Sequence, residues 1–266
     1  MKILLLLLTI YFLYSCEEKI EVEPINKTSE IIAVDGIITN EKKQHKIKLT
    51  YLSSHINAEP KPVTGAIVFI SNGDTSYMLR EFPLQSGIYI TDSLRAVLGK
   101  QYQLTINLGN KSFFALTGVE PVSPLQHSSY IKTEDTLYQL IPNLSTNAPT
   151  MWEFEIDWTN IGPISSSDSL MKAKVLYYYL ENIDIPQVFA SGKEEIKFPE
   201  GATIYERKYS LTQEHADFLR SMLLEHEWTG GNFDAAHANL LTNLSDGAIG
   251  FFGACTVVSD SIIVVP

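Results

Sequence analysis

The chain has 266 residues, of which 45% are hydrophobic, and a formal net charge of −11 at pH 7. This apolar content is enough for one large or two ordinary folded domains, so intrinsic disorder is not expected. The excess of acidic residues repels nucleic acid and anionic lipid, which excludes DNA or RNA as an expected partner.

The first fifteen residues have the features of a signal peptide. Lys2 gives a positive start, and residues 3–14 form an uncharged apolar run. This run is too short to cross a bilayer core, which needs about 20 helical residues. We therefore expect residues 1–15 to be cleaved rather than retained as a transmembrane anchor.

The signal sequence ends in a lipobox, Leu13-Tyr14-Ser15-Cys16, with an apolar residue at −3 and a small residue at −1. An ordinary signal-peptidase site would release a soluble protein, but the large Leu13 fits that alternative worse. The mature chain is therefore expected to begin at Cys16, with a diacylglyceryl group on its sulfur and palmitate-type acylation. Two or three acyl chains hold a protein stably in a bilayer.

Residues 16–29 form an acidic tether in which Glu17 and Glu18 directly follow the cysteine. One interpretation is a solvated linker that keeps the folded part away from the lipid headgroups. The other is an address, because an acidic stretch in this position resembles the surface-export signal of Bacteroidota-type lipoproteins. The second interpretation predicts an outer-membrane protein that faces the cell exterior.

Residues 30–124 are predicted to form a β-sandwich of immunoglobulin-like or transthyretin-like type. Residues 46–51 and 102–108 alternate polar and apolar side chains, as half-buried strands do. Asn72-Gly73 predicts a two-residue hairpin turn. The proline-rich stretch 121–124 marks the expected end of this domain.

Residues 125–266 are predicted to form a second β-rich domain with a helix near residues 211–227, so the fold class is mainly β with one or two helices. Residues 152–158 carry apolar side chains at every even position and acidic ones at every odd position. This period of two predicts a core stripe rather than a carbohydrate platform. The helix is expected to begin at a Ser210 cap with Gln213 as its capping-box partner.

Residues suited to catalysis or metal binding are sparse. Cys255 lies in an apolar run and is expected to be a buried small hydrophobe rather than a reactive thiol. The spacing of His215, His226 and His237 matches no zinc motif, and surface or capping roles are expected for them. No nucleophile elbow, phosphate loop or dinucleotide fingerprint occurs. We therefore predict no catalytic residue, no metal and no cofactor.

The stretch 227–243 is the expected place for recognition of a ligand or partner. Trp228, Asn232, Phe233 and Asp234 combine aromatic and polar side chains with a glycine-containing backbone, which suits a binding loop. The alternative is that Trp228 and Phe233 close over the core behind the end of the helix.

Four stretches together resemble a known family. They are residues 32–39, 62–66, 99–104 and 243–254. In this order and behind a lipobox, they resemble a Bacteroidota-type outer-membrane lipoprotein family with a domain of unknown function, whose members tend to be encoded beside TonB-dependent receptors. The resemblance implies a partnership with such a receptor barrel, and it supplies no catalytic residue.

The expected function is that of a surface-exposed, non-enzymatic accessory or ligand-capture subunit of a TonB-dependent transporter. A structural or assembly subunit of a larger envelope complex needs the same anchor without a ligand pocket, and is the first alternative. A surface hydrolase is the second. Glu153 and Glu155 are its nearest candidate carboxylates, although they project in the same direction from one strand.

Overall fold

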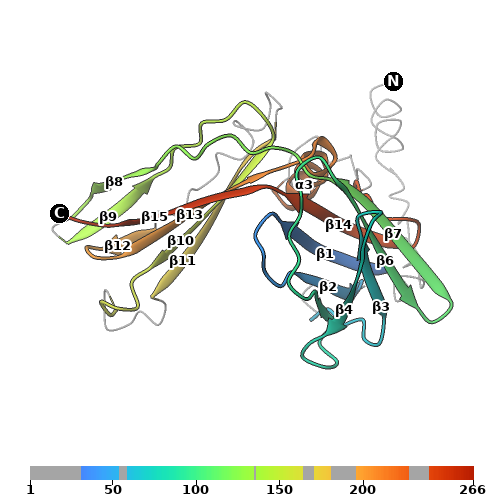
Figure 1. The fold of residues 1–266 in the computed structure, drawn as a ribbon. Helices are drawn as coiled ribbons and strands as arrows, with labels where there is room; N and C mark the ends of the chain where they lie inside the picture. The colour runs from blue at the N-terminus through green and yellow to red at the C-terminus, as the bar shows by residue number, and fades with distance from the viewer. Residues whose placement is uncertain (1–30, 54–58, 135, 164–170, 181–195, 228–239) are drawn as a thin grey trace, which may run out of the picture.

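A computed structural model of the protein describes residues 31–53, 59–134, 136–163, 171–180, 196–227 and 240–266. In these residues the chain forms three β-sheets and one helix, arranged as two β bodies that meet beneath the helix (Figure 1). The expectation of a mainly β fold with sandwich-like sheets is confirmed.

The first body is a single eight-stranded sheet. In spatial order its strands are β14 (Ala248–Cys255), β1 (Ile32–Thr39), β2 (Lys46–Tyr51), β5 (Ile88–Ile90), β4 (Ser76–Glu81), β3 (Ile67–Ser71), β6 (Gln101–Leu108) and β7 (Lys111–Gly118). Neighbouring strands are antiparallel, except that β14 and β1 are parallel. Each of the eight strands contributes buried apolar side chains to one shared core.

Local patterns explain most of these strands. Ile47 and Leu49 of β2 are fully buried, whereas Lys46 and Lys48, which alternate with them, are exposed, as the pattern predicts. The hairpin between β3 and β4 is centred one residue later than expected, on Gly73-Asp74. The Asn72 amide donates to the Thr75 carbonyl across this turn, and Gly73 has a positive φ of 89°.

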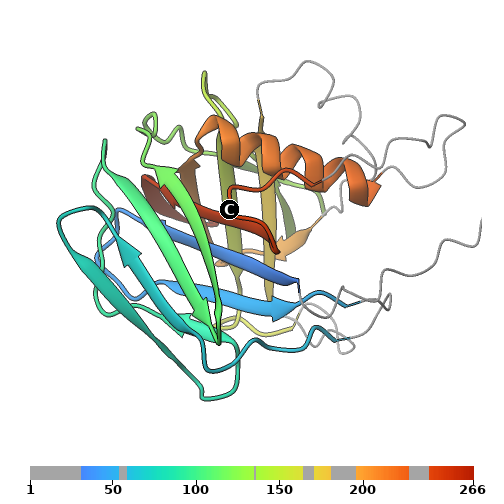
Figure 2. The ribbon, with the colours of Figure 1, turned by 90° about the vertical axis from the view of Figure 1, so that its right-hand side faces the viewer.

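The eight-stranded sheet curves until its two edge strands lie beside each other (Figure 2). Asn243 joins them, because its Nδ2 donates to the carbonyls of Leu116 in β7 and Phe252 in β14. The Ser245 amide also donates to the Phe114 carbonyl. Part of the 243–254 stretch that carries the family resemblance therefore closes the first body.

The second body is a sandwich of a four-stranded and a three-stranded sheet. The larger sheet contains, in spatial order, β11 (Lys172–Tyr179), β10 (Thr150–Asp157), β13 (Thr203–Ser210) and β15 (Val257–Ile263); the smaller contains β12 (Lys197–Pro199), β9 (Leu137–Ile141) and β8 (Ser129–Lys132). Trp152, Phe154 and Ile156 of β10 are buried between the sheets. The prediction that this aromatic stripe is core is confirmed.

The placement of β14 differs from the sequence-based domain assignment. Residues 248–255 were expected in the second domain of residues 125–266, but they pair with β1 of the first body over eight registered positions. β14 is an almost uninterrupted apolar run with most side chains buried, and such runs are typical of parallel strands that are covered on both faces. After Thr256 the same chain continues as β15 into the second body.

The helix α3 (Gln213–Glu227) covers the meeting point of the two bodies (Figure 2). Its Ala216 and Leu219 pack with Met151, Tyr209 and the fully buried Cys255, which confirms Cys255 as a small core side chain. Burial raises the pKa of the Cys255 thiol to about 12, so the reactive thiolate is disfavoured.

Two details of α3 correct the sequence analysis. Ser210 belongs to β13, and the helix is capped instead by Thr212, whose Oγ1 accepts a hydrogen bond from the amide of His215 at 3.2 Å. His215 is not at the surface either, because its ring stacks on Phe251 with ring centroids 4.4 Å apart. Burial lowers the pKa of His215 to about 4, so the ring is neutral at pH 7.

Candidate functional site

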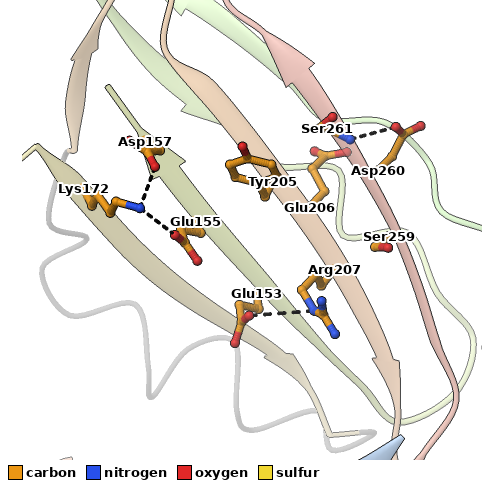
Figure 3. A pocket seen from close by; sticks show the side chains of 10 residues that line it. All are labelled: Glu153, Glu155, Asp157, Lys172, Tyr205, Glu206, Arg207, Ser259, Asp260 and Ser261. Atoms are coloured by element: carbon orange, nitrogen blue, oxygen red, sulfur yellow. Dashed lines mark hydrogen bonds and ion pairs between the residues drawn. The ribbon is translucent and has the colours of Figure 1, made fainter. Parts of the chain in front are cut away.

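The outer face of the four-stranded sheet forms an open, shallow pocket with a volume of about 510 Å³ (Figure 3). The lining residues are Glu153, Glu155, Asp157, Lys172, Tyr205, Glu206, Arg207, Ser259, Asp260 and Ser261. Because side chains alternate along a strand, the odd positions of β10 and β13 point outward while Trp152 and Phe154 fill the core. We call this surface the polar face.

Ion pairs cross the polar face from strand to strand. Lys172 contacts Asp157 at 2.6 Å and Glu155 at 3.6 Å, and Lys174 contacts Glu153 at 2.5 Å. Arg207 approaches Glu153 from the other side at 3.9 Å. Glu153 and Glu155, the nearest candidates for hydrolysis, therefore each lie within ion-pair distance of a basic side chain on a neighbouring strand.

Asp157 illustrates what this pairing does chemically. A hydrogen bond from Lys172, with further hydrogen bonds from Thr159, lowers its pKa to about 2. A carboxyl group with such a pKa carries no proton to donate near neutral pH. The polar face offers fixed hydrogen-bond acceptors and donors around Tyr205, whose side chain is 45% exposed, and this suits a polar ligand better than acid–base chemistry.

Two buried charged residues of β13, Lys208 and Glu206, fasten the 119–128 segment that links the bodies. Glu206 also lines the polar face, whereas Lys208 does not. Lys208 is only 1% exposed, and its Nζ donates to Ser123 Oγ at 2.8 Å, to the Ser145 carbonyl at 2.9 Å and to the Pro124 carbonyl at 3.4 Å. The ammonium group also lies 5.4 Å from the ring centre of Trp152. Burial lowers the pKa of Lys208, and these partners compensate the buried charge.

Glu206 holds the end of the same linking segment. Its Oε1 accepts a hydrogen bond from the Ser128 amide at 3.1 Å, and its Oε2 lies 3.7 Å from His127 Nδ1. The other ring nitrogen of His127 lies 3.6 Å from Asp260 of β15. The linking segment is thus attached to two adjacent strands of the second body.

The junction is completed where the chain crosses from β14 to β15. Thr256 donates from its Oγ1 to the Glu120 carbonyl at 2.6 Å, and its amide donates to Ser210 Oγ at 2.9 Å. Asn40 of the first body accepts a hydrogen bond from the Val257 amide at 2.8 Å. These contacts fix the second body, and with it the polar face, relative to the first.

An ion pair between Glu41 and Arg207 adds a charged contact across the junction, with 2.5 Å between the Glu41 carboxylate and the guanidinium. Burial alone would raise the pKa of Glu41, but hydrogen bonds from Lys43 and Arg207 and their positive charges outweigh it and lower the pKa from 4.5 to about 2. Arg207 also lies over the ring of Tyr209, 5.5 Å from its centre.

We expect the substitution Glu41→Gln to lower the stability of the protein at pH 7 by about 1 kcal/mol, a value reduced for partial exposure of the pair. Because the folded-state pKa of Glu41 is depressed, its contribution is present above about pH 4.5 and is lost as the pH falls toward 2. Denaturant unfolding at pH 7 and pH 3 measures both effects.

The matched control for this prediction is Asp74→Asn, which removes the carboxylate of the exposed Lys100–Asp74 pair within the first body. It is expected to change stability at pH 7 by less than about 0.5 kcal/mol. Equal effects of the two substitutions would show that the Glu41–Arg207 contact does not stabilise the junction.

The lipidation, export-signal and binding residues selected from sequence lie outside the part of the chain that the structure describes. This applies to the lipidation residue Cys16, the export-signal residues Glu17 and Glu18, and the binding candidates Trp228, Asn232, Phe233 and Asp234. Their roles stay predictions. Sequence reasoning missed Tyr205, Arg207 and Lys172, although the alternation within residues 203–209 places Tyr205 and Arg207 on one face.

The described residues contain neither a metal-binding cluster nor a membrane-spanning helix. Across these residues no group of three or more His, Cys, Asp or Glu side chains is arranged to hold a metal ion. In the same part of the chain no helix is both long and apolar enough to cross a membrane.

Comparison with solved structures finds fibronectin type III segments at low similarity. The FN1–FN3 domains of chicken CNTN1 share 10% identity over 68% of this chain and 62% of that chain, with a TM-score of 0.28. A two-domain fibronectin type III segment of chicken tenascin shares 12% identity over 66% of this chain and 88% of that chain, with a TM-score of 0.20. This chain therefore spans less than two thirds of the CNTN1 segment.

Comparison with curated proteins gives no match. In contrast, the sequence profile described as "Domain of unknown function (DUF4249)" matches residues 17–261, which include both β bodies and the junction between them. The chain therefore belongs to the DUF4249 family.

Proposed function

We propose that this protein is a surface-exposed outer-membrane lipoprotein, anchored through Cys16, that acts as a non-enzymatic accessory or ligand-capture subunit of a TonB-dependent transporter. The lipobox and the acidic residues Glu17 and Glu18 support the anchor and the side of the membrane. The resemblance to lipoproteins encoded beside such receptors supports the partner.

The observation that carries the ligand-capture role is the polar face. It is open and concave, it is built on a regular sheet, and its hydrogen-bonding groups are held by cross-strand ion pairs. The junction contacts of Lys208 and Thr256 keep this sheet at a fixed orientation to the first body. A preorganised polar surface loses little conformational entropy when it binds, which favours recognition.

The partnership can be tested by purifying the tagged full-length protein from solubilised outer membrane. A TonB-dependent receptor barrel is expected to co-purify with the wild-type chain. The variant Cys16→Ala, which cannot take the lipid, is expected to leave the membrane fraction and to recover at least tenfold less receptor. Recovery of no barrel with the wild-type chain would refute the partnership.

The role of the polar face can be tested in a strain in which the gene has been deleted and restored as variants. Tyr205→Ala is expected to reproduce the nutrient-uptake defect of the deletion, because Tyr205 is exposed at the centre of the face. Tyr179→Ala is the matched control, since Tyr179 is exposed to a similar extent on β11 but does not line the face. Normal uptake with Tyr205→Ala would exclude capture by this surface.

The first alternative, a structural or assembly subunit of a larger envelope complex, is favoured by the number of contacts that join the two bodies. General envelope damage on deletion, without loss of a particular nutrient, would support it. The less favoured alternative is a surface hydrolase. Absence of turnover of glycans, esters and peptides by the purified protein would remove that option.

A further inference from the structure

The outward surface of strands β3, β4, β6 and β7 has a composition unlike the rest of this acidic protein. The register places Met78, Phe69, Thr105 and Phe114 in one row across the four strands. Phe114 is 45% exposed and Met78 is 63% exposed. These strands face the viewer in Figure 2, and no other described element lies over them. We call this surface the neutral face.

Most of the side chains around this row are polar but uncharged, and two further apolar side chains, Ile67 and Leu116, are exposed among them. The remaining outward positions of the four strands are Ile67, Ser71, Ser76, Arg80, Gln101, Gln103, Asn107, Ser112, Leu116 and Gly118. Arg80 is the single charged residue among them, and there is no carboxylate. Depletion of charge together with exposed Phe and Met is typical of the core of a protein–protein interface.

We infer that the neutral face is the contact surface between two copies of this chain. The full chain carries a formal charge of −11, so two copies repel each other over most orientations. At the neutral face they can approach without opposing carboxylates. A two-fold arrangement brings the same apolar row of each copy against the other, as in an isologous sheet-on-sheet contact.

The same side chains argue against a bilayer as the occupant. Gln103, Thr105 and Asn107 lie between the apolar residues and would lose water without gaining hydrogen-bond partners in lipid. Arg80 is the one basic residue among the outward positions named above, and the attraction of a single basic side chain to lipid headgroups would be small. In a second copy, uncharged amides and hydroxyls can bond to groups of their own kind.

The inference is tested by crosslinking the full-length protein in isolated outer membranes. Gln103→Cys places an exposed thiol near the centre of the neutral face, and Lys48→Cys places an exposed thiol on β2 as a matched control. The native Cys255 is fully buried. A short bismaleimide is expected to give a species of twice the monomer mass with Gln103→Cys, at least tenfold more than with Lys48→Cys.

A second experiment adds a negative charge to the neutral face and measures the same crosslink. Phe114→Glu and, separately, Met78→Glu are expected to reduce the Gln103→Cys crosslink at least tenfold, whereas Lys48→Glu leaves it unchanged. Unchanged thermal unfolding of either variant ensures that loss of the crosslink does not reflect loss of the fold. The inference is overturned by equal crosslinking at the two cysteines, by no dimer, or by an adduct with a different protein. None of these results depends on the receptor partnership proposed above.

Discussion

Replacing Gly250 with alanine is expected to unfold most of the protein. Gly250 lies opposite Val34 in the parallel pair of β14 and β1, with a positive φ of 96°. A Cβ atom at this position would lie 2.1 Å from the carbonyl oxygen of Val34. Because that atom belongs to the backbone, the two strands would have to separate, at an expected loss of at least about 4 kcal/mol.

The control for this prediction is Gly99→Ala. Gly99 also has a positive φ, of 77°, but a Cβ atom there would meet nothing within 4 Å. This substitution therefore measures backbone strain without the clash, and a loss of about 1 kcal/mol is expected. Thermal and urea unfolding of the two variants give the comparison. A loss below about 1 kcal/mol for Gly250→Ala would show that β14 does not pair with β1 as described.

Replacing Lys208 with methionine is expected to lower the free energy of unfolding by about 3 kcal/mol. The methionine fills most of the space, but it leaves Ser123 Oγ and the carbonyls of Ser145 and Pro124 without the ammonium donor. Leaving a buried acceptor unpaired costs about 1–3 kcal/mol. These three hydrogen bonds are only partly buried, so about 1 kcal/mol is expected for each, and loss of the contact with Trp152 adds to this.

Lys174→Met provides the same chemical change on the exposed side of the same sheet, where Lys174 pairs with Glu153. An exposed ion pair contributes less than about 1 kcal/mol, so little change is expected. Amide hydrogen exchange adds a local measurement, since only Lys208→Met should increase exchange in the 119–128 segment. Similar stability and exchange in both variants would mean that Lys208 does not fasten this segment.

The parts of the fold that sequence predicted well are those with a short repeat of side-chain character. The alternation in β2 and the stripe of Trp152, Phe154 and Ile156 each identify a strand and its buried face without knowledge of any partner. Cys255 is similar, because an uninterrupted apolar neighbourhood predicts burial whichever strand packs against it.

The features that sequence did not predict depend on partners far away in the chain. In the sequence, Lys208 resembles an ordinary solvent-exposed lysine. Its burial is favourable only because the 119–128 segment and Ser145 supply hydrogen-bond acceptors for its ammonium group. The pairing of Gly250 with Val34 joins residues more than two hundred positions apart, and no local pattern encodes that choice. The polar face was missed for the same reason, since β10, β11 and β13 each supply only part of it.

The passage of one chain through Thr256 into both bodies has a consequence for biosynthesis. β14 and β15 are made after all other described strands, and each completes a different sheet. During synthesis, one edge of β1 and one edge of β13 therefore stay unpaired until β14 and β15 have been made. Any fragment that stops before residue 248 lacks a strand in both bodies at once, so neither body is a self-sufficient unit that truncation could isolate.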